Sequence, residues 1–278
     1  MANAQTPNTA KKQGSSSGSN LFASLAIIIC FIIGYVVWKF VMGNPAHFEG
    51  GDPELGQPLP GNYYGMVYKA GLVVPVLLGL LLMTVVFSIE RFFVITKAAG
   101  KGNVDEFVTR IQGFLAAGNI DAAIAECDKQ QGSVANVIKS GLIKYKDSSA
   151  DVNVNTEKAA IAIQKEIEEA TALEMPMLEK NMTVIATLVS IGTLTGLLGT
   201  VTGMIKAFAA LATGGAPDQA ALANGISEAL INTATGIFTS TIAIIMYNVF
   251  TSKIDKLTYS IDEAGFSIVQ TYASTHGN

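Results

Sequence analysis

Long apolar stretches separated by polar segments form the main pattern of this chain. A helix needs about 20 residues to cross the hydrocarbon core of a bilayer. Four apolar stretches reach that length, and they cover residues 21–42, 70–96, 182–211 and 222–250. The polar segments between them show helical spacing rather than strict alternation. The pattern predicts an all-α integral membrane protein with four transmembrane helices.

The polar segments predict the rest of the organisation. Residues 1–20 are rich in Ser, Gly, Asn and Lys and predict a disordered tail. Residues 43–69 are rich in Gly and Pro and predict an irregular loop. Residues 97–181 carry amphipathic helical patterns, so we expect long transmembrane helices that extend into a helical bundle beside the membrane. Residues 251–278 are expected to form a C-terminal tail.

Composition agrees with a membrane protein and gives no sign of an enzyme. Of the 278 residues, 50% are hydrophobic and only 14% are charged, and the mean hydropathy is +0.40, which is unlike an ordinary soluble domain. We expect no catalytic residue, cofactor, metal site or nucleic-acid partner, and a lipid bilayer as the surroundings. The two cysteines, Cys30 and Cys127, are expected to be buried free thiols.

The distribution of basic residues predicts the orientation of the chain. Of the 18 Lys and Arg residues, eleven lie between Arg91 and Lys180, one lies within residues 43–69, and none lies in the turn before residue 222. Cytoplasmic segments of membrane proteins are enriched in Lys and Arg. We therefore expect both termini and residues 97–181 in the cytoplasm. The first stretch exceeds the core of a usual signal peptide, so it is expected to remain as a transmembrane helix.

The fourth stretch carries a line of polar residues on one helical face. Glu228, Asn232, Thr235 and Thr239 recur at spacings of four, three and four, which places them above one another on a helix. Small residues, among them Thr233 and Gly236, lie beside this line, and large apolar residues cover the rest. One side of the helix therefore suits a polar or tightly packed interior, and the other suits lipid.

Glu228 is the candidate ionisable group within this line. An ionisable group inside a transmembrane helix costs several kcal/mol unless it is neutralised, paired or hydrated. A functional role and a position near the helix end, in contact with water, remain equal alternatives from the sequence. The hydroxyl line is open to two interpretations as well, since Thr side chains relay protons but also bond to the carbonyl one turn back.

The third stretch carries a line of glycines that predicts close helix packing. The segment "GLLGTVTG" follows no strand and lacks the Gly-Lys-Ser/Thr ending of a phosphate-binding loop, which argues against nucleotide binding. On a helix, small residues at every fourth position allow a neighbouring helix to approach closely. These glycines are Gly192, Gly196, Gly199 and Gly203, with Thr193 and Thr200 seven residues apart on the neighbouring side.

No Asp lies in the four stretches, and no second carboxylate lies deep within one of them beside Glu228. A complete proton pathway would require an acid that can be reached from both sides of the membrane. We therefore expect a partner protein to supply that acid.

The order and spacing of several segments resemble the MotA/TolQ/ExbB proton channel family, and most closely its ExbB members. The resemblance covers about two thirds of the chain, from Gly71 to Ser260. The segments that carry it are "ERFF", "VDEFVTRIQGFLAAGNIDAAIAECDKQQGSVANVIKSGL", "LEKNMTVIATL", "GLLGTVTGMIKAF", "GISEALINTATGI" and "IIMYNVF". Each segment alone is a weak signal, whereas their combined order is specific.

The resemblance implies a function, partners and a location. In that family a pentamer of three-helix subunits encloses the membrane helices of an ExbD-type dimer, and proton flow drives work on a TonB-type protein for outer-membrane transport. It implies that this chain lies in a bacterial inner membrane with residues 43–69 in the periplasm. It also implies that Thr200 and Thr233 line the pore opposite a membrane aspartate of the partner, and that Glu228 matches the family's glutamate in the last helix.

The chain departs from the family pattern in its first transmembrane helix. Residues 21–42 and the loop after them are additional, and we expect this helix to brace the pentamer from outside. Thr193 and Ile242 stand where the family often has prolines, and Thr235 and Thr239 make the expected pore wall more polar. Alternative functions are a TolQ-type role in envelope maintenance, a MotA-type motility stator, and a passive membrane scaffold whose polar line serves packing alone.

Overall fold

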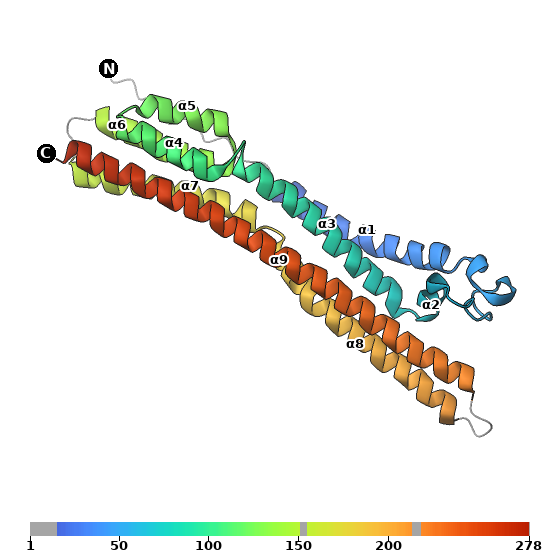
Figure 1. Cartoon of the computed structure of the whole chain (residues 1–278). Coiled ribbons are helices and arrows are strands. Elements are labelled where there is room, and N and C mark those ends of the chain that lie inside the picture. Colours follow the sequence, from blue (N-terminus) through green and yellow to red (C-terminus); the bar gives the residue numbers. More distant parts are fainter. Residues whose placement is uncertain (1–15, 151–154, 213–217, 278) are drawn as a thin grey trace, which may run out of the picture. The chain divides into compact units, whose positions relative to one another are not determined.

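The computed structural model describes residues 16–150, 155–212 and 218–277, and helices form most of this part of the chain (Figure 1). Of the expected tail, residues 1–15 lie outside the described residues, and helix α1 begins at Ser16. The helices, in chain order, are α1 (Ser16–Val36), the π-helix η1 (Val37–Met42), the 3-10 turns η2 (Pro45–His47) and η3 (Glu49–Gly51), α2 (Tyr63–Lys69), α3 (Val73–Ala99), α4 (Val104–Ala116), α5 (Ile120–Gln130), α6 (Gly132–Ala150), α7 (Thr156–Glu179), α8 (Met182–Ala212) and α9 (Gln219–His276).

Within the described residues, four helical segments are long and apolar enough to cross a membrane. They lie within Ser24–Met42, Val73–Ala116, Thr156–Ala212 and Gln219–His276. The predicted all-α membrane fold is therefore confirmed. Residues 251–276, expected as a tail, continue α9 as helix, and several of their apolar side chains, such as Ile261 and Ile268, are buried.

The chain divides into two compact units, and three of its helices contribute to both. The first unit comprises residues 1–83 and 192–237, and the second comprises residues 84–191 and 238–278. The described part of the first unit consists of α1, the short elements after it, the start of α3, the last two thirds of α8 and the beginning of α9. In the second, α4 to α7 pack with the remaining parts of α3, α8 and α9.

The segment between α1 and α3 is more ordered than its Gly and Pro content predicts. We call residues 43–72 the connection. Phe48 forms an isolated antiparallel bridge with Pro58, and Asn62 caps α2 by accepting a hydrogen bond from the Gly65 N–H. Trp38 of η1 stacks on Tyr68 of α2 with ring centroids 4.7 Å apart. These contacts give the connection an aromatic core of its own.

In the second unit, Arg91 of α3 stabilises the end of α7. Its guanidinium, of which 2% is exposed, pairs with Glu90 and donates to the carbonyls of Met177 and Leu178 at 3.1 and 3.2 Å. The last carbonyls of a helix have no partner within that helix. Arg91 supplies one here, at the point where α7 ends and Asn181 takes the positive φ of 62°.

We predict that Arg91→Met lowers the free energy of unfolding by about 3 to 5 kcal/mol, because it leaves buried carbonyls and the Glu90 carboxylate without their partner. Denaturant unfolding in detergent micelles measures this loss. Lys97→Met, on the exposed face of the same helix, is the control and should change stability little. Equal effects of the two substitutions would contradict the role given to Arg91.

Glu126 of α5 joins two helices of the second unit through a pair of basic side chains. Its carboxylate accepts hydrogen bonds from Lys129 at 3.2 Å and from Arg110 of α4 at 2.7 Å. Only 12% of the Glu126 side chain is exposed. The Lys129 hydrogen bond, followed by that of Arg110, lowers the pKa of Glu126 below its ordinary value of 4.5 despite the partial burial.

A lowered pKa means that the ionised Glu126 stabilises the fold above pH 4.5, and that this contribution is lost as the pH falls through the folded-state pKa. We predict that Glu126→Gln is less stable than the wild type at neutral pH and that the difference shrinks below pH 4.5. Unfolding curves of both proteins across this pH range test it. A difference that stays constant with pH would show that the carboxylate charge contributes nothing.

Candidate functional site in helices α8 and α9

Glycines bring α8 and α9 into close contact within the first unit. A Cβ added at Gly196 would lie 3.0 Å from the Asn232 carbonyl oxygen and from the Gly236 Cα, and one added at Gly236 would lie 2.6 Å from the Gly192 carbonyl oxygen. At Gly203, an added Cβ would lie 2.7 Å from the Ala229 nitrogen. The two backbones therefore pack too closely for larger side chains at these positions.

The close packing brings two hydroxyls together across the helix pair. Thr200 of α8 and Thr233 of α9 form a short hydrogen bond between their Oγ1 atoms. Thr233 also donates to the Ala229 carbonyl at 3.0 Å, and Thr200 lies 3.3 Å from the Gly196 carbonyl. Each hydroxyl thus has a partner on its own helix and a partner on the other. Such a pair can pass a proton from one oxygen to the next or fix a water molecule.

Glu228 is buried and carries a counter-ion. Its carboxylate accepts two hydrogen bonds from Lys206 Nζ, at 2.8 and 2.9 Å. Only 6% of the Glu228 side chain is exposed, against 57% of the Lys206 side chain. Glu228 lies close to the start of α9, and its side chain is buried within the chain. The exposed part of the pair is therefore the lysine, while the carboxylate is covered.

The backbone of the connection approaches Glu228 through a glycine. Gly71 has a φ of +87°, which side chains other than glycine's rarely allow. A Cβ added at this position would lie 2.6 Å from Glu228 Oε1 and 3.4 Å from Lys206 Nζ. Gly71 therefore allows the chain to turn directly against the ion pair.

Asn232, one turn after Glu228, is fully buried and fastens the connection to α9. Its Nδ2 donates to the Ala70 carbonyl at 3.0 Å. Its Oδ1 is buried and has no hydrogen-bond donor among the described residues. A Cβ at Gly199 would overlap the Asn232 side chain. A buried amide oxygen without a donor is a place where a water molecule or a protonated group is accommodated at low cost.

The remaining predicted residues lie on the same helices in different settings. Thr193 is exposed on α8, and Thr235 donates to the Ile231 carbonyl of its own helix at 2.8 Å. Thr239 is fully buried but belongs to the second unit. The structure therefore gathers Thr200, Thr233, Glu228 and Asn232 in one unit together with the glycines. Large side chains of α8, such as Leu198 and Ile205, are more than half exposed and suited to lipid.

Sequence reasoning missed Lys206, which is the only charged residue within α8. Its signal was available, because Lys206 and Glu228 lie at similar distances from the turn that joins α8 to α9. Two helices of a hairpin place such residues at the same level, and an isolated charge in an apolar helix requires a partner.

Comparisons with known proteins agree with a membrane channel. Residues 130–263 match the model of the MotA/TolQ/ExbB proton channel family, a range that contains all four gathered residues and Lys206. An ExbB-like biopolymer transport protein of Synechocystis is 34% identical over 88 residues, which are 31% of this chain and 42% of that protein. TolQ of the Tol-Pal system of Pseudomonas aeruginosa is 27% identical over 159 residues, 57% of this chain and 69% of that protein.

The biopolymer transport protein ExbB of Pseudomonas putida is 26% identical over 165 residues, 58% of this chain and 49% of that protein. The chain therefore spans less than half of the length of the two ExbB-type relatives. Both the ExbB and the TolQ branches are represented among its relatives. The connection lies outside the range matched by the family model.

We predict that Lys206→Met destabilises the protein by about 1 to 3 kcal/mol, because it leaves the covered Glu228 carboxylate without a donor. The double variant Lys206→Met/Glu228→Gln removes both charges and should recover most of this loss. Denaturant unfolding of the two variants in detergent measures the coupling. A double variant as unstable as Lys206→Met alone would show that the lysine acts through packing rather than through its charge.

Proposed function

Because the chain belongs to the MotA/TolQ/ExbB proton channel family, whose members are channels and not enzymes, we propose that it is the channel and stator subunit of a proton-driven motor. The chain is a multi-pass membrane protein of a family found in the inner membrane. In this proposal protons pass along α8 and α9, and their flow drives a mechanical step in an attached partner.

The observation that carries the proposal is the hydrogen bond between Thr200 and Thr233 where glycines bring α8 and α9 close together. It lies near Glu228, which forms an ion pair with Lys206. Packing alone does not account for a buried carboxylate, since such a group is costly in a membrane and its removal would favour association of the helices. Hydroxyls, a carboxylate and a buried amide oxygen in sequence along α9 provide successive sites for a proton or a water molecule.

The proposal includes partners that the family implies. An ExbD-type or TolR-type membrane subunit supplies the carboxylate that this chain lacks, and copies of this chain, five in the family pattern, surround a dimer of that subunit. Both termini and α4 to α7 face the cytoplasm in this arrangement, because most of the basic residues lie there. The driven partner is a TonB-type protein for outer-membrane transport.

A TolQ-type role is the second candidate, because the match to TolQ covers 69% of that protein and the match to the Pseudomonas putida ExbB only 49%. The two roles differ in what stops when the gene is deleted. Loss of energised uptake with an intact envelope favours the ExbB-type role. Loss of envelope integrity with normal uptake favours the TolQ-type role.

We predict that liposomes holding this protein and its ExbD-like or TolR-like partner conduct protons, and that Thr233→Val and Glu228→Gln reduce the flux to the level of empty liposomes. Thr233→Val keeps the side-chain volume and removes the hydroxyl. The matched control is Thr202→Val on α8, whose hydroxyl bonds to the Gly199 carbonyl of its own helix at 3.0 Å. A dye that reports internal pH measures the flux.

Undiminished proton flux in Thr233→Val would show that the Thr200–Thr233 hydroxyl pair serves packing alone, and it would favour the passive scaffold. Equal losses in Thr233→Val and Thr202→Val would show that the helix pair is sensitive to any change in its hydroxyls. Flux that does not depend on the partner would contradict the proposed division of the pathway between two proteins.

A further inference from the structure

A hollow of about 260 Å³ lies between the connection and the first turns of α9. The connection contributes residues 58–61, Met66 and Lys69 to its wall, and α9 contributes Ala223, Asn224, Ser227 and Glu228. A water molecule in the liquid occupies about 30 Å³, so the hollow has room for several. The Glu228 carboxylate, which is otherwise covered, thus borders a space large enough for water.

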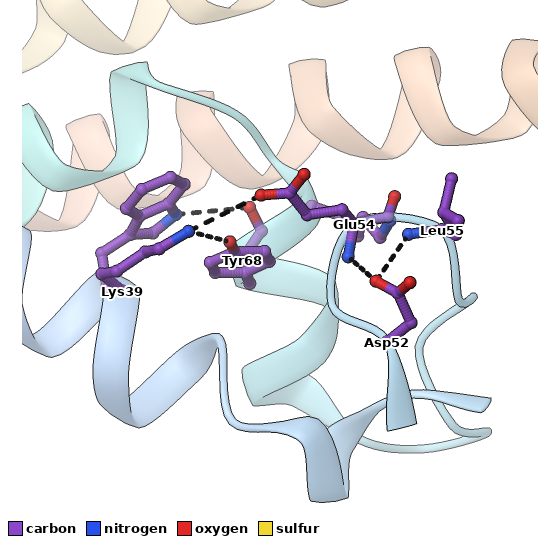
Figure 2. Close-up of polar contacts among 7 residues, drawn as sticks. Lys39, Asp52, Glu54, Leu55 and Tyr68 are labelled. Carbon is purple, nitrogen blue, oxygen red and sulfur yellow. Dashed lines mark hydrogen bonds and ion pairs between the residues drawn. The ribbon is translucent and has the colours of Figure 1, made fainter. Parts of the chain in front are cut away.

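The wall formed by the connection is held in place by contacts that do not involve α9. Trp38 Nε1 donates to the Tyr68 carbonyl at 3.3 Å. Lys39 donates to the Tyr68 hydroxyl at 3.3 Å and lies 3.7 Å from Glu54 (Figure 2). Lys69 donates to the Glu54 carbonyl at 2.8 Å. These bonds join η1, the loop and α2 into one framework.

The loop of the connection is also fixed by a local turn. The Asp52 carboxylate accepts hydrogen bonds from the backbone N–H groups of Glu54 and Leu55, at 2.8 and 3.1 Å (Figure 2). These bonds lower the pKa of Asp52, so the turn persists through the neutral range. The loop beside the hollow therefore has a defined conformation.

The framework is fastened to α9 at three points around Glu228. Asn232 holds the Ala70 carbonyl, Gly71 lies against the carboxylate, and Ile231 packs against the aromatic core of the connection. The contacts of this segment thus centre on the one buried carboxylate of the candidate pathway. Bracing of neighbouring subunits, the role expected of the first helix, does not require such contacts.

We propose that this hollow is the outer entrance of the ion pathway, through which water and the proton reach Glu228, and that the connection forms its fixed outer wall. The inference rests on the proposed function. It assigns a role to the part of the chain that lies outside the family match. Lys69 and Glu228 are the charged residues that line this hollow.

The test is the access of a charged, membrane-impermeant thiol reagent to Ser227→Cys, in a protein whose buried native cysteines are replaced by alanine (Cys30→Ala and Cys127→Ala). We expect labelling in right-side-out vesicles and none in inside-out vesicles. Leu230→Cys is the control on the same helix, because its side chain is 67% exposed on the apolar surface and should not meet an aqueous reagent.

A pair of substitutions on α2 tests whether the reagent enters through the hollow. Met66→Trp fills part of the space and should slow the labelling of Ser227→Cys several-fold. Tyr63→Trp adds the same ring on the same helix at a position that is 77% exposed, and it should leave the labelling rate unchanged. Failure to label Ser227→Cys, or equal rates in the two tryptophan variants, would overturn the inference.

Proton flux then separates this inference from the proposed function. The reagent acts on the folded protein, and labelled Ser227→Cys should conduct at the level of empty liposomes, whereas the unlabelled protein should conduct with its partner. If labelled Ser227→Cys keeps its full proton flux while Thr233→Val abolishes the flux, the hollow is not the entrance. The proposed channel function would then still hold. Absence of partner-dependent flux in every variant would overturn the channel and the entrance together.

Discussion

The ion pair of Glu228 with Lys206 is the interaction on which the site depends. A carboxylate enclosed by apolar helices is stable only where a counter-charge and donors replace the lost water. Lys206 supplies both oxygens with hydrogen bonds at 2.8 and 2.9 Å, and it remains 57% exposed itself. The carboxylate end of the pair is therefore covered, and the lysine end is exposed.

The glycines of α8 make the polar contacts possible. Membrane helices gain little from apolar burial, because lipid is as apolar as their side chains, so close packing and hydrogen bonds hold them together. The approach at Gly196 and Gly203 brings Thr200 within hydrogen-bond reach of Thr233. Gly71 likewise allows a close approach, because its lack of a side chain lets the backbone of the connection turn against Glu228. The helix packing and the candidate site thus depend on the same small residues.

Periodicity in the sequence predicted the helices and the polar face of α9, because a spacing of three to four residues fixes which side chains share a helical face. It also predicted the glycine line, since small residues at every fourth position have few other uses in a membrane helix. Lys206 was missed because a pattern within one helix does not show what lies on the next. The bond from Asn232 to Ala70 joins residues 162 apart, and no local pattern indicates it.

The central claim is that Glu228 takes part in proton transfer rather than only in packing. The most direct measurement is the infrared difference spectrum of membranes that hold this protein and its partner, recorded when a proton gradient is imposed. We expect a change in a carboxyl band that is missing from Glu228→Gln and reduced in Thr233→Val. Spectra of the wild type and Glu228→Gln that change identically on imposing the gradient would contradict the account.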